Sequence, residues 1–246
     1  MKLRIARSQD GTISHYDAFE INLKPGMTVL DALFYIQDNI DPSLSFRYSC
    51  RGAVCGSCGI LVNKMPVLAC RTQLKSVKDM KLNLKKFDAL AINPESKWDV
   101  ANEILIEPLP NFPIITDLVV DLTKFYDALE SMKLWKDSKV SGTPDLQSPE
   151  DRETIESYVN CIMCALCFGS CPVNSKHEEY LGPAALAKSY RFFKDSRIKE
   201  SERFLAAASV PEGAPMCDLI MNCVKVCPKG VAPGGAIRKI KQEMSN

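Results

Sequence analysis

The sequence predicts an α+β protein with two domains: a mixed domain of strands and helix over residues 1–105, and an all-helical domain over residues 106–246. Short segments in the first hundred residues alternate apolar with other residues, which is typical of strands. Beyond residue 116, the apolar residues follow helical spacing in pieces that loops interrupt. A length of 246 residues is ample for two domains that each bury a core.

The first domain begins with two predicted strands and a helix. Residues 3–5 and 19–23 show the alternation of strands. Thr28 is suited to cap a helix, and Asp31 completes a weak variant of the capping box. The helix ends before Pro42 and carries an apolar stripe with the spacing of an amphipathic helix: Val29, Leu33, Ile36 and Ile40.

More strands are predicted after this helix. Residues 60–62 and 67–69 flank Asn-Lys-Met-Pro and predict a hairpin. Residues 80–84 alternate again and predict a closing strand. Three prolines within residues 106–116 predict an extended segment that crosses from the first domain to the second.

The second domain is predicted to consist of helices joined by loops. Residues 117–134 have a helical pattern, whereas residues 136–152 are polar, contain two prolines and predict a loop. Residues 181–195 predict a further helix, because Pro183 is tolerated in a first helical turn and strong helix formers follow it.

Composition excludes several classes of protein. The 31 basic residues are balanced by 30 acidic ones, whereas a nucleic-acid-binding protein would carry a basic excess. The N-terminus has no apolar core of a signal peptide, and no run approaches the roughly 18 apolar residues of a membrane span. The 11 cysteines are odd in number and clustered, which favours metal binding in a reducing compartment over disulfides.

The first cysteine group has the spacing C-x4-C-x2-C-x11-C and consists of Cys50, Cys55, Cys58 and Cys70. Its C-x4-C-x2-C core is the plant-type spacing for a [2Fe–2S] cluster. Gly52, Gly56 and Gly59 allow a tight loop whose backbone N–H groups can point at the sulfurs. Together with the predicted strands and helix, this loop predicts a ferredoxin-like β-grasp domain.

The alternatives for the first group are a zinc site or structural free cysteines. Zinc sites usually pair two C-x2-C knuckles, and only Cys55 and Cys58 fit that pattern. A Rieske centre needs two histidine ligands, but His15 and His177 lie beside none of these cysteines. An iron–sulfur cluster is therefore the favoured interpretation.

The second cysteine group matches the bacterial-ferredoxin pattern C-x2-C-x2-C-x3-C-P without a departure: Cys161, Cys164, Cys167, Cys171 and Pro172. In two-cluster ferredoxins the fourth cysteine of such a run binds the other cluster. We therefore expect Cys161, Cys164, Cys167 and Cys227 to hold a [4Fe–4S] cluster. Cys171 is expected to join Cys217 and Cys223 at a third site, which accounts for all 11 cysteines.

The third cysteine group lacks one expected ligand, because Ile220 occupies the second cysteine position. Three thiolates leave one iron of a cubane without a ligand, and its loss gives a [3Fe–4S] cluster. Fewer thiolate charges and an apolar neighbour are expected to raise the reduction potential. The alternative is a [4Fe–4S] cluster whose fourth iron binds Asp218 or water.

Three clusters of different type suggest a relay for single electrons. The segment V-A-P-G-G-A at 231–236 is a poor match to a dinucleotide-binding motif and lacks its strand–helix context. Because iron–sulfur clusters carry single electrons, substrate chemistry requires a partner with a two-electron cofactor.

The motifs S-C-R-x3-C-G-S-C-G, C-I-M-C-A-L-C-F-G-S-C-P and C-D-L-I-M-N-C-x3-C-P, in this order, resemble those of the iron–sulfur subunit of succinate dehydrogenase and fumarate reductase. Residues 112–121 and 181–197 also resemble segments of that family, so the likeness runs nearly end to end. The resemblance implies an oxidoreductase subunit that transfers electrons through [2Fe–2S], [4Fe–4S] and [3Fe–4S] clusters.

The resemblance also implies partners. A flavoprotein subunit with bound FAD would interconvert succinate and fumarate. Membrane-anchor subunits, often with haem b, would hold the quinone near the third cluster. The chain would then be peripheral, on the cytoplasmic face of a prokaryotic inner membrane.

The sequence departs from the ubiquinone-type members of this family. A tryptophan is expected a few residues after the Cys-Pro pair of the second cysteine group, and a histidine directly after the first cysteine of the third group; Val173–Lys176 and Asp218 stand there instead. The departure favours menaquinone. The candidates for a quinone-facing surface are Pro172, Lys176, Asp218 and Lys241, although the two lysines could equally be solvated surface residues.

Two other functions remain open from the sequence. A free multicluster ferredoxin would usually be acidic and shorter than this neutral chain. An iron–sulfur subunit of a soluble flavin-dependent enzyme, such as a thiol-dependent fumarate reductase, would tend to carry further cysteine-rich modules. Copurification with a membrane anchor, with a soluble flavoprotein, or with neither distinguishes the three.

Overall fold

The computed structural model describes residues 1–79, 97–136 and 145–245. Their contacts divide the chain into two compact units. The first unit comprises Met1–Leu122 together with Ile162–Ser170, and the second comprises Thr123–Cys161 and Cys171–Asn246. The sequence predicts a division after residue 105, whereas the first unit continues to Leu122 and takes in a segment of the second cysteine group.

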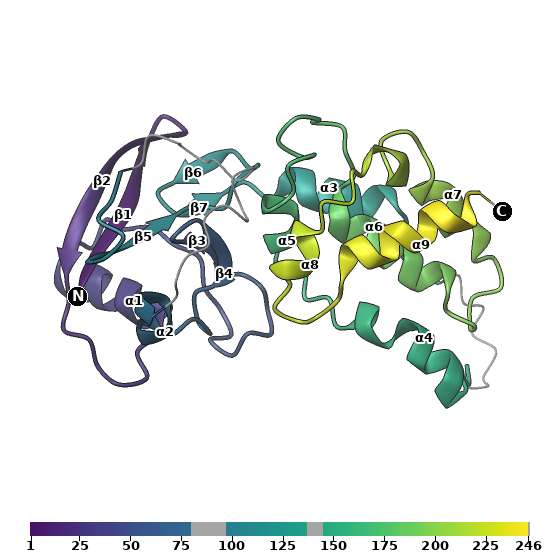
Figure 1. Cartoon of the computed structure of the whole chain (residues 1–246), viewed down its shortest axis with the longest axis horizontal. Coiled ribbons are helices and arrows are strands. Elements are labelled where there is room, and N and C mark those ends of the chain that lie inside the picture. Colours follow the sequence, from purple (N-terminus) through teal and green to yellow (C-terminus); the bar gives the residue numbers. More distant parts are fainter. Residues whose placement is uncertain (80–96, 137–144, 246) are drawn as a thin grey trace. The chain divides into compact units, whose positions relative to one another are not determined.

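The first unit is built on a mixed five-stranded sheet, with strand order β2-β1-β5-β3-β4 (Figure 1). Strands β1 and β5 are parallel, and the other pairs are antiparallel. The strands span β1 Lys2–Gln9, β2 Thr12–Glu20, β3 Gly59–Val62, β4 Met65–Leu68 and β5 Glu103–Glu107. The first predicted strand is confirmed, whereas the second, predicted at 19–23, overlaps β2 only at Phe19 and Glu20, because β2 begins at Thr12 and ends at Glu20.

The predicted hairpin is confirmed as β3 and β4. Its two turn residues, Asn63 and Lys64, have φ angles of 48° and 64°, as a two-residue hairpin turn of the right twist requires. The Asn63 side chain also accepts a hydrogen bond of 2.8 Å from the backbone N–H of Leu105. This contact joins the hairpin to β5.

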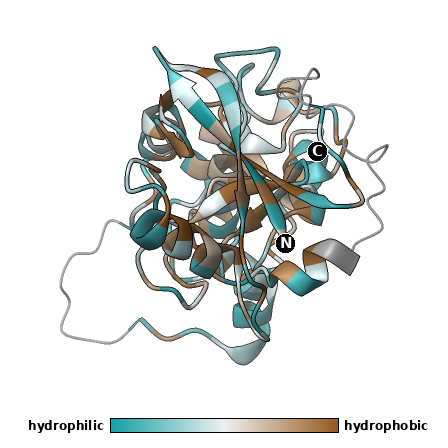
Figure 2. Ribbon diagram, turned by 90° about the vertical axis from the view of Figure 1, so that its left-hand side faces the viewer, coloured by the Kyte–Doolittle hydropathy of each residue, from teal (hydrophilic) through white to brown (hydrophobic). Residues whose placement is uncertain are grey.

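The core of the first unit lies between the sheet and helix α1, Val29–Asn39. Leu3, Ile5 and Ile36 are fully buried there, and every residue of β5 is buried. Figure 2 shows the apolar residues of the sheet as brown bands on the strands. The predicted capping box is confirmed, because Asp31 N donates to Thr28 Oγ1 at 3.1 Å and Thr28 N donates to Asp31 Oδ2 at 2.9 Å.

Three predictions for the middle of the chain concern residues 80–84, 106–116 and 117–134. The predicted closing strand at residues 80–84 lies outside the described residues, and helix α2, Leu74–Asp79, precedes it. The predicted extended segment, 106–116, contains the end of β5 and the short strand β6, Ile114–Thr116.

The predicted helix over residues 117–134 was wrong at both ends. Strand β7, Val119–Val120, comes first, and helix α3 covers only Thr123–Ser131. Asp117 explains the late start, because it has a φ of 44° and accepts backbone N–H groups from Ser8 and Ser45. These tertiary contacts hold the residue in a turn against β1.

The elements described in the second unit are helices. Besides α3, they are α4 Pro149–Val159, α6 Gly182–Phe193, α7 Glu202–Ala208, the 3₁₀ helix η2 Ala214–Met216, α8 Asn222–Lys225 and α9 Pro233–Glu243. Helix α6 packs against both α7 and α9. Its start matches the prediction, whereas the predicted loop 136–152 ends early, because Ser148 caps α4.

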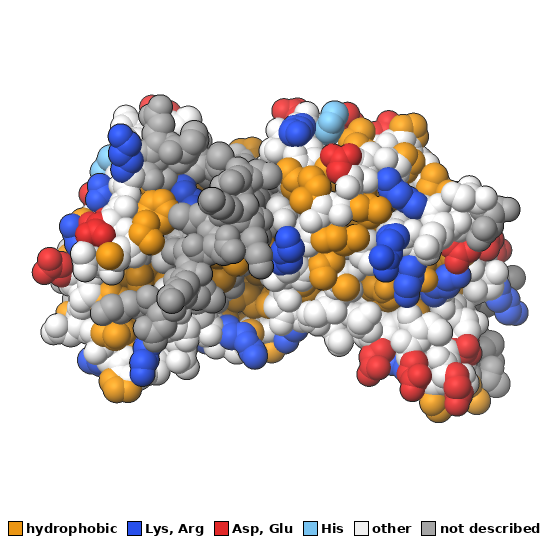
Figure 3. Space-filling model, viewed as in Figure 1, with side chains coloured by type: hydrophobic (Ala, Val, Ile, Leu, Met, Phe, Trp, Pro, Cys, Tyr) orange, Lys and Arg blue, Asp and Glu red, His pale blue; other side chains and the backbone are white. Residues whose placement is uncertain are grey.

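Helix α4 presents an acidic face. Its residues Glu150, Asp151, Glu153 and Glu156 are exposed, and Figure 3 shows acidic side chains gathered over this helix. Ile155 and Tyr158 form the opposite, buried face. Across the described residues, no helix has the length and apolar character that crossing a membrane requires.

Candidate metal centres

The first cysteine loop wraps its backbone around the sulfur of Cys50. The Cys50 Sγ atom accepts backbone N–H groups from Gly52, Val54 and Cys55 at 3.3–3.4 Å. Arg51 and Ala53 make this wrapping possible by adopting left-handed conformations, each with a φ of 55°. Hydrogen bonds of this kind stabilise negative charge on the sulfur, as a cluster ligand requires.

The four cysteines of the first group interact in sequence: Cys50 with Cys55, Cys55 with Cys58, and Cys58 with Cys70. Hydrogen bonds from Ser57 and from the backbone of Cys50 lower the pKa of Cys55 to about 6. Burial raises the pKa of Cys58, which interacts with both Cys70 and Cys55. Cys50 is exposed whereas Cys58 is buried, so the site extends from the surface of the first unit into its interior.

Aromatic side chains hold the segment before Cys50 against helix α1. The Phe34 ring lies edge-on to Tyr48, with ring centroids 4.5 Å apart, and to Phe46 at 5.3 Å. The guanidinium of Arg51 lies over the Phe34 ring at 4.6 Å, within the range of a cation–π contact. Helix α1 therefore positions the first cysteine loop through side chains that the cysteine pattern does not include.

The first cysteine loop also contacts part of the second cysteine group within the first unit. A Cβ atom on Gly59 would lie 3.0 Å from the carbonyl oxygen of Cys164 and 3.2 Å from the Leu166 side chain. A Cβ atom on Gly56 would meet the Cys164 backbone more closely still. The glycines of the first loop are thus needed for this packing as well as for turning the chain.

The second and third cysteine loops share one backbone pattern. Two and four residues after the first cysteine, each loop has a left-handed residue: Met163 and Ala165 in the second, Leu219 and Met221 in the third, with φ angles of 53–67°. Each loop then enters a four-residue helix, α5 Leu166–Gly169 or α8. Ile220 therefore stands in a loop folded like one that presents a thiol at that position.

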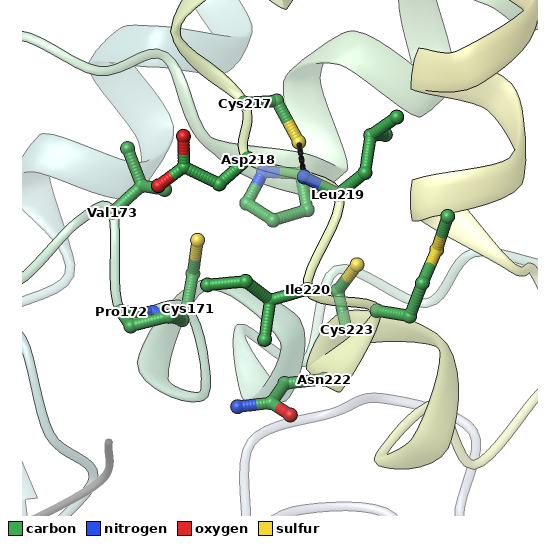
Figure 4. Close-up of a pocket in the computed structure, with 11 residues that line it drawn as sticks. Cys171, Pro172, Val173, Cys217, Asp218, Leu219, Ile220, Asn222 and Cys223 are labelled. Atoms are coloured by element: carbon green, nitrogen blue, oxygen red, sulfur yellow. Dashed lines mark hydrogen bonds between the residues drawn. The ribbon is translucent and has the colours of Figure 1, made fainter.

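Three thiols face one another in a pocket of the second unit: those of Cys171, Cys217 and Cys223 (Figure 4). Burial raises the pKa values of Cys171 and Cys223, the latter to about 12, and each is raised further by the negative charge of neighbouring cysteines. Thiols that cannot easily ionise alone become ligands once metal compensates their charge. Figure 4 shows the Ile220 side chain between Cys171 and Cys223, and 46% of this residue is exposed.

Backbone N–H groups point at the sulfurs here as well. Leu219 N donates to Cys217 Sγ at 3.4 Å, and Val231 N donates to Cys227 Sγ at 3.3 Å. Cys223 receives a backbone hydrogen bond from Gly234. Gly234 belongs to the segment V-A-P-G-G-A, a poor match to a dinucleotide-binding motif, and its missing Cβ leaves room for the Met221 side chain.

The donor sets fit iron–sulfur clusters, because sulfur ligands and N–H donors directed at them are what such clusters require. Among the described residues, no three His, Cys, Asp or Glu side chains are arranged around one ion. A cluster instead spreads its ligands around several irons. The predicted [4Fe–4S] set is divided, since Cys164 and Cys167 belong to the first unit and Cys161 and Cys227 to the second.

The predicted quinone-facing residues occupy different environments. Pro172 and Asp218 line the pocket of Cys171, Cys217 and Cys223, whereas Lys176 is exposed. Lys241 donates to the carbonyl oxygen of Cys217 at 2.8 Å and to that of Pro215 at 3.3 Å. The sequence suggests either a quinone contact or a solvated side chain for this lysine, and neither includes its bond to the third loop.

Two family descriptions match the chain. A 2Fe-2S iron-sulfur cluster binding domain matches residues 2–127, and a 4Fe-4S dicluster domain matches residues 157–231. The boundary between these matches falls beyond residue 105, as does that of the compact units.

Curated relatives match nearly the whole chain. The fumarate reductase iron-sulfur subunit of Escherichia coli O6:H1 is 34% identical, covering 100% of this chain and 93% of that protein. The corresponding subunit of Haemophilus influenzae is 35% identical over 93% of this chain and 86% of that protein. That of Mycobacterium tuberculosis is 35% identical, with coverages of 92% and 84%.

A solved chain of the Mycobacterium smegmatis Sdh1 complex in the apo form has the same fold. Its TM-score is 0.79 at 22% identity, covering 99% of this chain and 95% of that one. Sequence, fold and cysteine arrangement therefore agree, and the chain belongs to the family of iron–sulfur subunits of fumarate reductase and succinate dehydrogenase.

Proposed function

We propose that the chain connects the FAD of a flavoprotein subunit with a membrane quinone, through a [2Fe–2S], a [4Fe–4S] and a [3Fe–4S] cluster. When bound, these clusters supply one-electron steps between two two-electron reactions. The observation that carries the proposal is the pocket in which Cys171, Cys217 and Cys223 gather while Ile220 takes the place of a fourth ligand. Because this site has only three thiol ligands, its cluster is suited to have the highest reduction potential of the three clusters.

The ligand sets follow from the spacing of the cysteines and from their surroundings. Cys50, Cys55, Cys58 and Cys70 would hold the [2Fe–2S] cluster in a β-grasp domain, a class that the mixed sheet and α1 support. Cys161, Cys164, Cys167 and Cys227 would hold the [4Fe–4S] cluster, and Cys171, Cys217 and Cys223 the [3Fe–4S] cluster. The second domain would be of the all-helical ferredoxin type.

The chain's own residues orient and shield these groups. Backbone N–H groups around Cys50 and Cys217 would stabilise added negative charge on the sulfurs. Burial of Cys171, Cys217 and Cys223 excludes much of the water from the third site. The exposed Cys50 is suited to exchange electrons with a flavoprotein that docks over the first loop.

The quinone side of the proposal depends on the same pocket. Pro172 and Asp218 line it and are candidates for the surface that faces quinone. The other two candidates are Lys176, which is exposed, and Lys241, which donates to the carbonyl oxygen of Cys217. Menaquinone is favoured. Anchor subunits, with or without haem b, would hold the chain on the cytoplasmic face of the inner membrane.

The test is EPR spectroscopy of the isolated complex, oxidised and then reduced stepwise, with iron and sulfide counted. We expect roughly nine irons per chain, a signal from the third site in the oxidised state, and two further signals on reduction. About ten irons and no signal when oxidised would mean that a fourth ligand completes the third site. Isolation with a soluble flavoprotein and without an anchor would replace the quinone-linked function by that of a soluble reductase.

A further inference from the structure

Tyr180 is a buried residue that neither the cysteine pattern nor the proposed function assigns. Only 1% of it is exposed, and its hydroxyl has no partner at full hydrogen-bond geometry among the described residues, although it lies close enough to Cys217 for a weaker hydrogen-bonding interaction with that thiol. Native proteins seldom leave a buried hydroxyl unpaired, so such a group calls for an explanation. Here the explanation lies in what surrounds the hydroxyl.

The chain around Tyr180 belongs to the wall of the third site. Cys171, Pro172 and Val173 line the pocket before it in the sequence, and Pro183 lines it three residues after. The turn between them is closed by backbone hydrogen bonds, including that from Tyr180 N to His177 O. This segment therefore leaves the pocket and returns to it, with Tyr180 buried on the return.

The Tyr180 hydroxyl lies within electrostatic range of the three cysteines that form the third site, and Cys217 interacts with it most strongly. Burial raises the pKa of Tyr180 most, and the negative charges of Cys217, Cys171 and Cys223 raise it further. The hydroxyl thus lies beside acceptors that would carry more negative charge once a cluster is bound and reduced. A phenol has one hydrogen to donate, and sulfur accepts it.

We infer that Tyr180 is a positioning residue for the third site: its hydroxyl donates a hydrogen bond to Cys217 Sγ or to a sulfide of the bound cluster, and thereby raises the reduction potential of that site. The inference rests on the proposed function, because it requires a cluster on Cys171, Cys217 and Cys223. A hydrogen bond to cluster sulfur stabilises the reduced form more than the oxidised form, since the reduced form carries the additional electron.

The test compares Tyr180→Phe with Tyr190→Phe in the intact complex. Tyr190 is a matched control, since it is also a buried tyrosine of the second unit, but its neighbours are Tyr158 and Glu243 rather than the cysteines. EPR-monitored redox titration gives the midpoint potential of each cluster. For Tyr180→Phe we expect the third site to become about tenfold harder to reduce, a downward shift of about 59 mV for a one-electron couple.

The first and second clusters are expected to keep their potentials in both variants, and iron content is expected to stay at the wild-type value. An unchanged third potential in Tyr180→Phe, with full iron content, overturns the inference. If this variant loses its third cluster, a fluorotyrosine placed at position 180 decides, because a more acidic phenol is a stronger donor. The potential must then rise, and a potential equal to wild type overturns the inference.

If the proposed [3Fe–4S] assignment is wrong, the wild-type complex itself contains about ten irons and gives no EPR signal from the oxidised third site. In that case, the cluster is a four-iron one, and the two tyrosine variants report on its potential in the same way. The role of Tyr180 is thus decided separately from the type of cluster.

Discussion

The Cα atom of Cys164 lies 2.8 Å from the point at which Gly56 would carry a Cβ atom. The carbonyl oxygen of Ile162 is equally close to that point. No real Cβ atom tolerates either distance, so the backbones of the first and second cysteine loops touch where Gly56 has only hydrogen. This contact brings two predicted ligand loops together inside the first unit.

Gly56→Ala is expected to separate these loops. Gly56 has a φ of 76°, so the variant suffers both backbone strain and a clash with backbone atoms, each worth about 1–3 kcal/mol. Gly26→Ala is the matched control, because Gly26 has the same φ and nothing within 4 Å of the new methyl group. We expect lost iron and altered EPR spectra only in Gly56→Ala, and equal behaviour of the two variants would contradict the role of the contact.

Ile220→Cys is expected to add a fourth thiol to the third site. Leu219 and Met221 already have the backbone conformation of the second loop, where a cysteine occupies this position. We expect one more iron per chain, loss of the EPR signal from the oxidised site, and a lower potential. Ile220→Val controls for the change in volume. Retention of the wild-type oxidised signal in Ile220→Cys would show that this position does not face the cluster.

Lys241→Ala separates two roles that the sequence left open for this lysine. If its bonds to Cys217 and Pro215 carry its function, the variant loses third-site iron and about 1–2 kcal/mol of local stability. Lys176→Ala is the comparison, since Lys176 is exposed and is the other lysine proposed to face quinone. A raised KM for quinone in both variants, with full iron content, would instead favour a quinone-facing role.

Asp195→Asn is expected to destabilise the second unit by about 3 kcal/mol. Burial alone would raise the pKa of Asp195, but hydrogen bonds from Arg197 and the charge of Arg191 outweigh it, and the pKa falls below its ordinary value of 3.8. A carboxylate with a lowered pKa contributes stability above its unfolded pKa and loses it only as pH falls through the folded pKa.

The difference in melting temperature between wild type and Asp195→Asn is therefore expected to be constant from pH 5 to pH 8. Thermal unfolding monitored by circular dichroism, at matched iron content, measures it. Asp145→Asn serves as an exposed control and is expected to have little effect, because surface ion pairs contribute little. A difference that shrinks between pH 7 and pH 5 would mean that the pKa of Asp195 is raised.

Features within one loop or one helix were predictable from the sequence, because short-range geometry determines them. The cysteine spacing lets the sulfurs of Cys50 and Cys55 each accept the backbone N–H of the other residue. Thr28 and Asp31 likewise form their capping box. The position of Ile220 at the place of a missing ligand was also predictable, because Ile220 follows Cys217 by three residues, as Cys164 follows Cys161.

Features that depend on distant parts of the chain were not predictable. The residues that follow Asp117 have a helical sequence pattern, so the sequence predicts a helix there. In the structure, hydrogen bonds with Arg7, Ser8 and Ser45 hold Asp117 in a turn instead. Nothing near Tyr180 marks it as a neighbour of three sulfurs, since Cys217 and Cys223 follow it by many residues. The segment V-A-P-G-G-A at 231–236 has no metal-binding pattern of its own, and only the fold brings the Gly234 N–H to Cys223.

Residues 162–170 belong to the first unit although they follow part of the second in sequence, and this order affects how the chain folds during synthesis. Ribosomes deliver the chain from its N-terminus, and a domain generally folds once its last residue has emerged. The first unit, although N-terminal in most of its length, lacks a piece of its packing until Ser170 has been synthesised. By then Thr123–Cys161 of the second unit has already emerged, so the nascent chain cannot finish one unit before it starts the other.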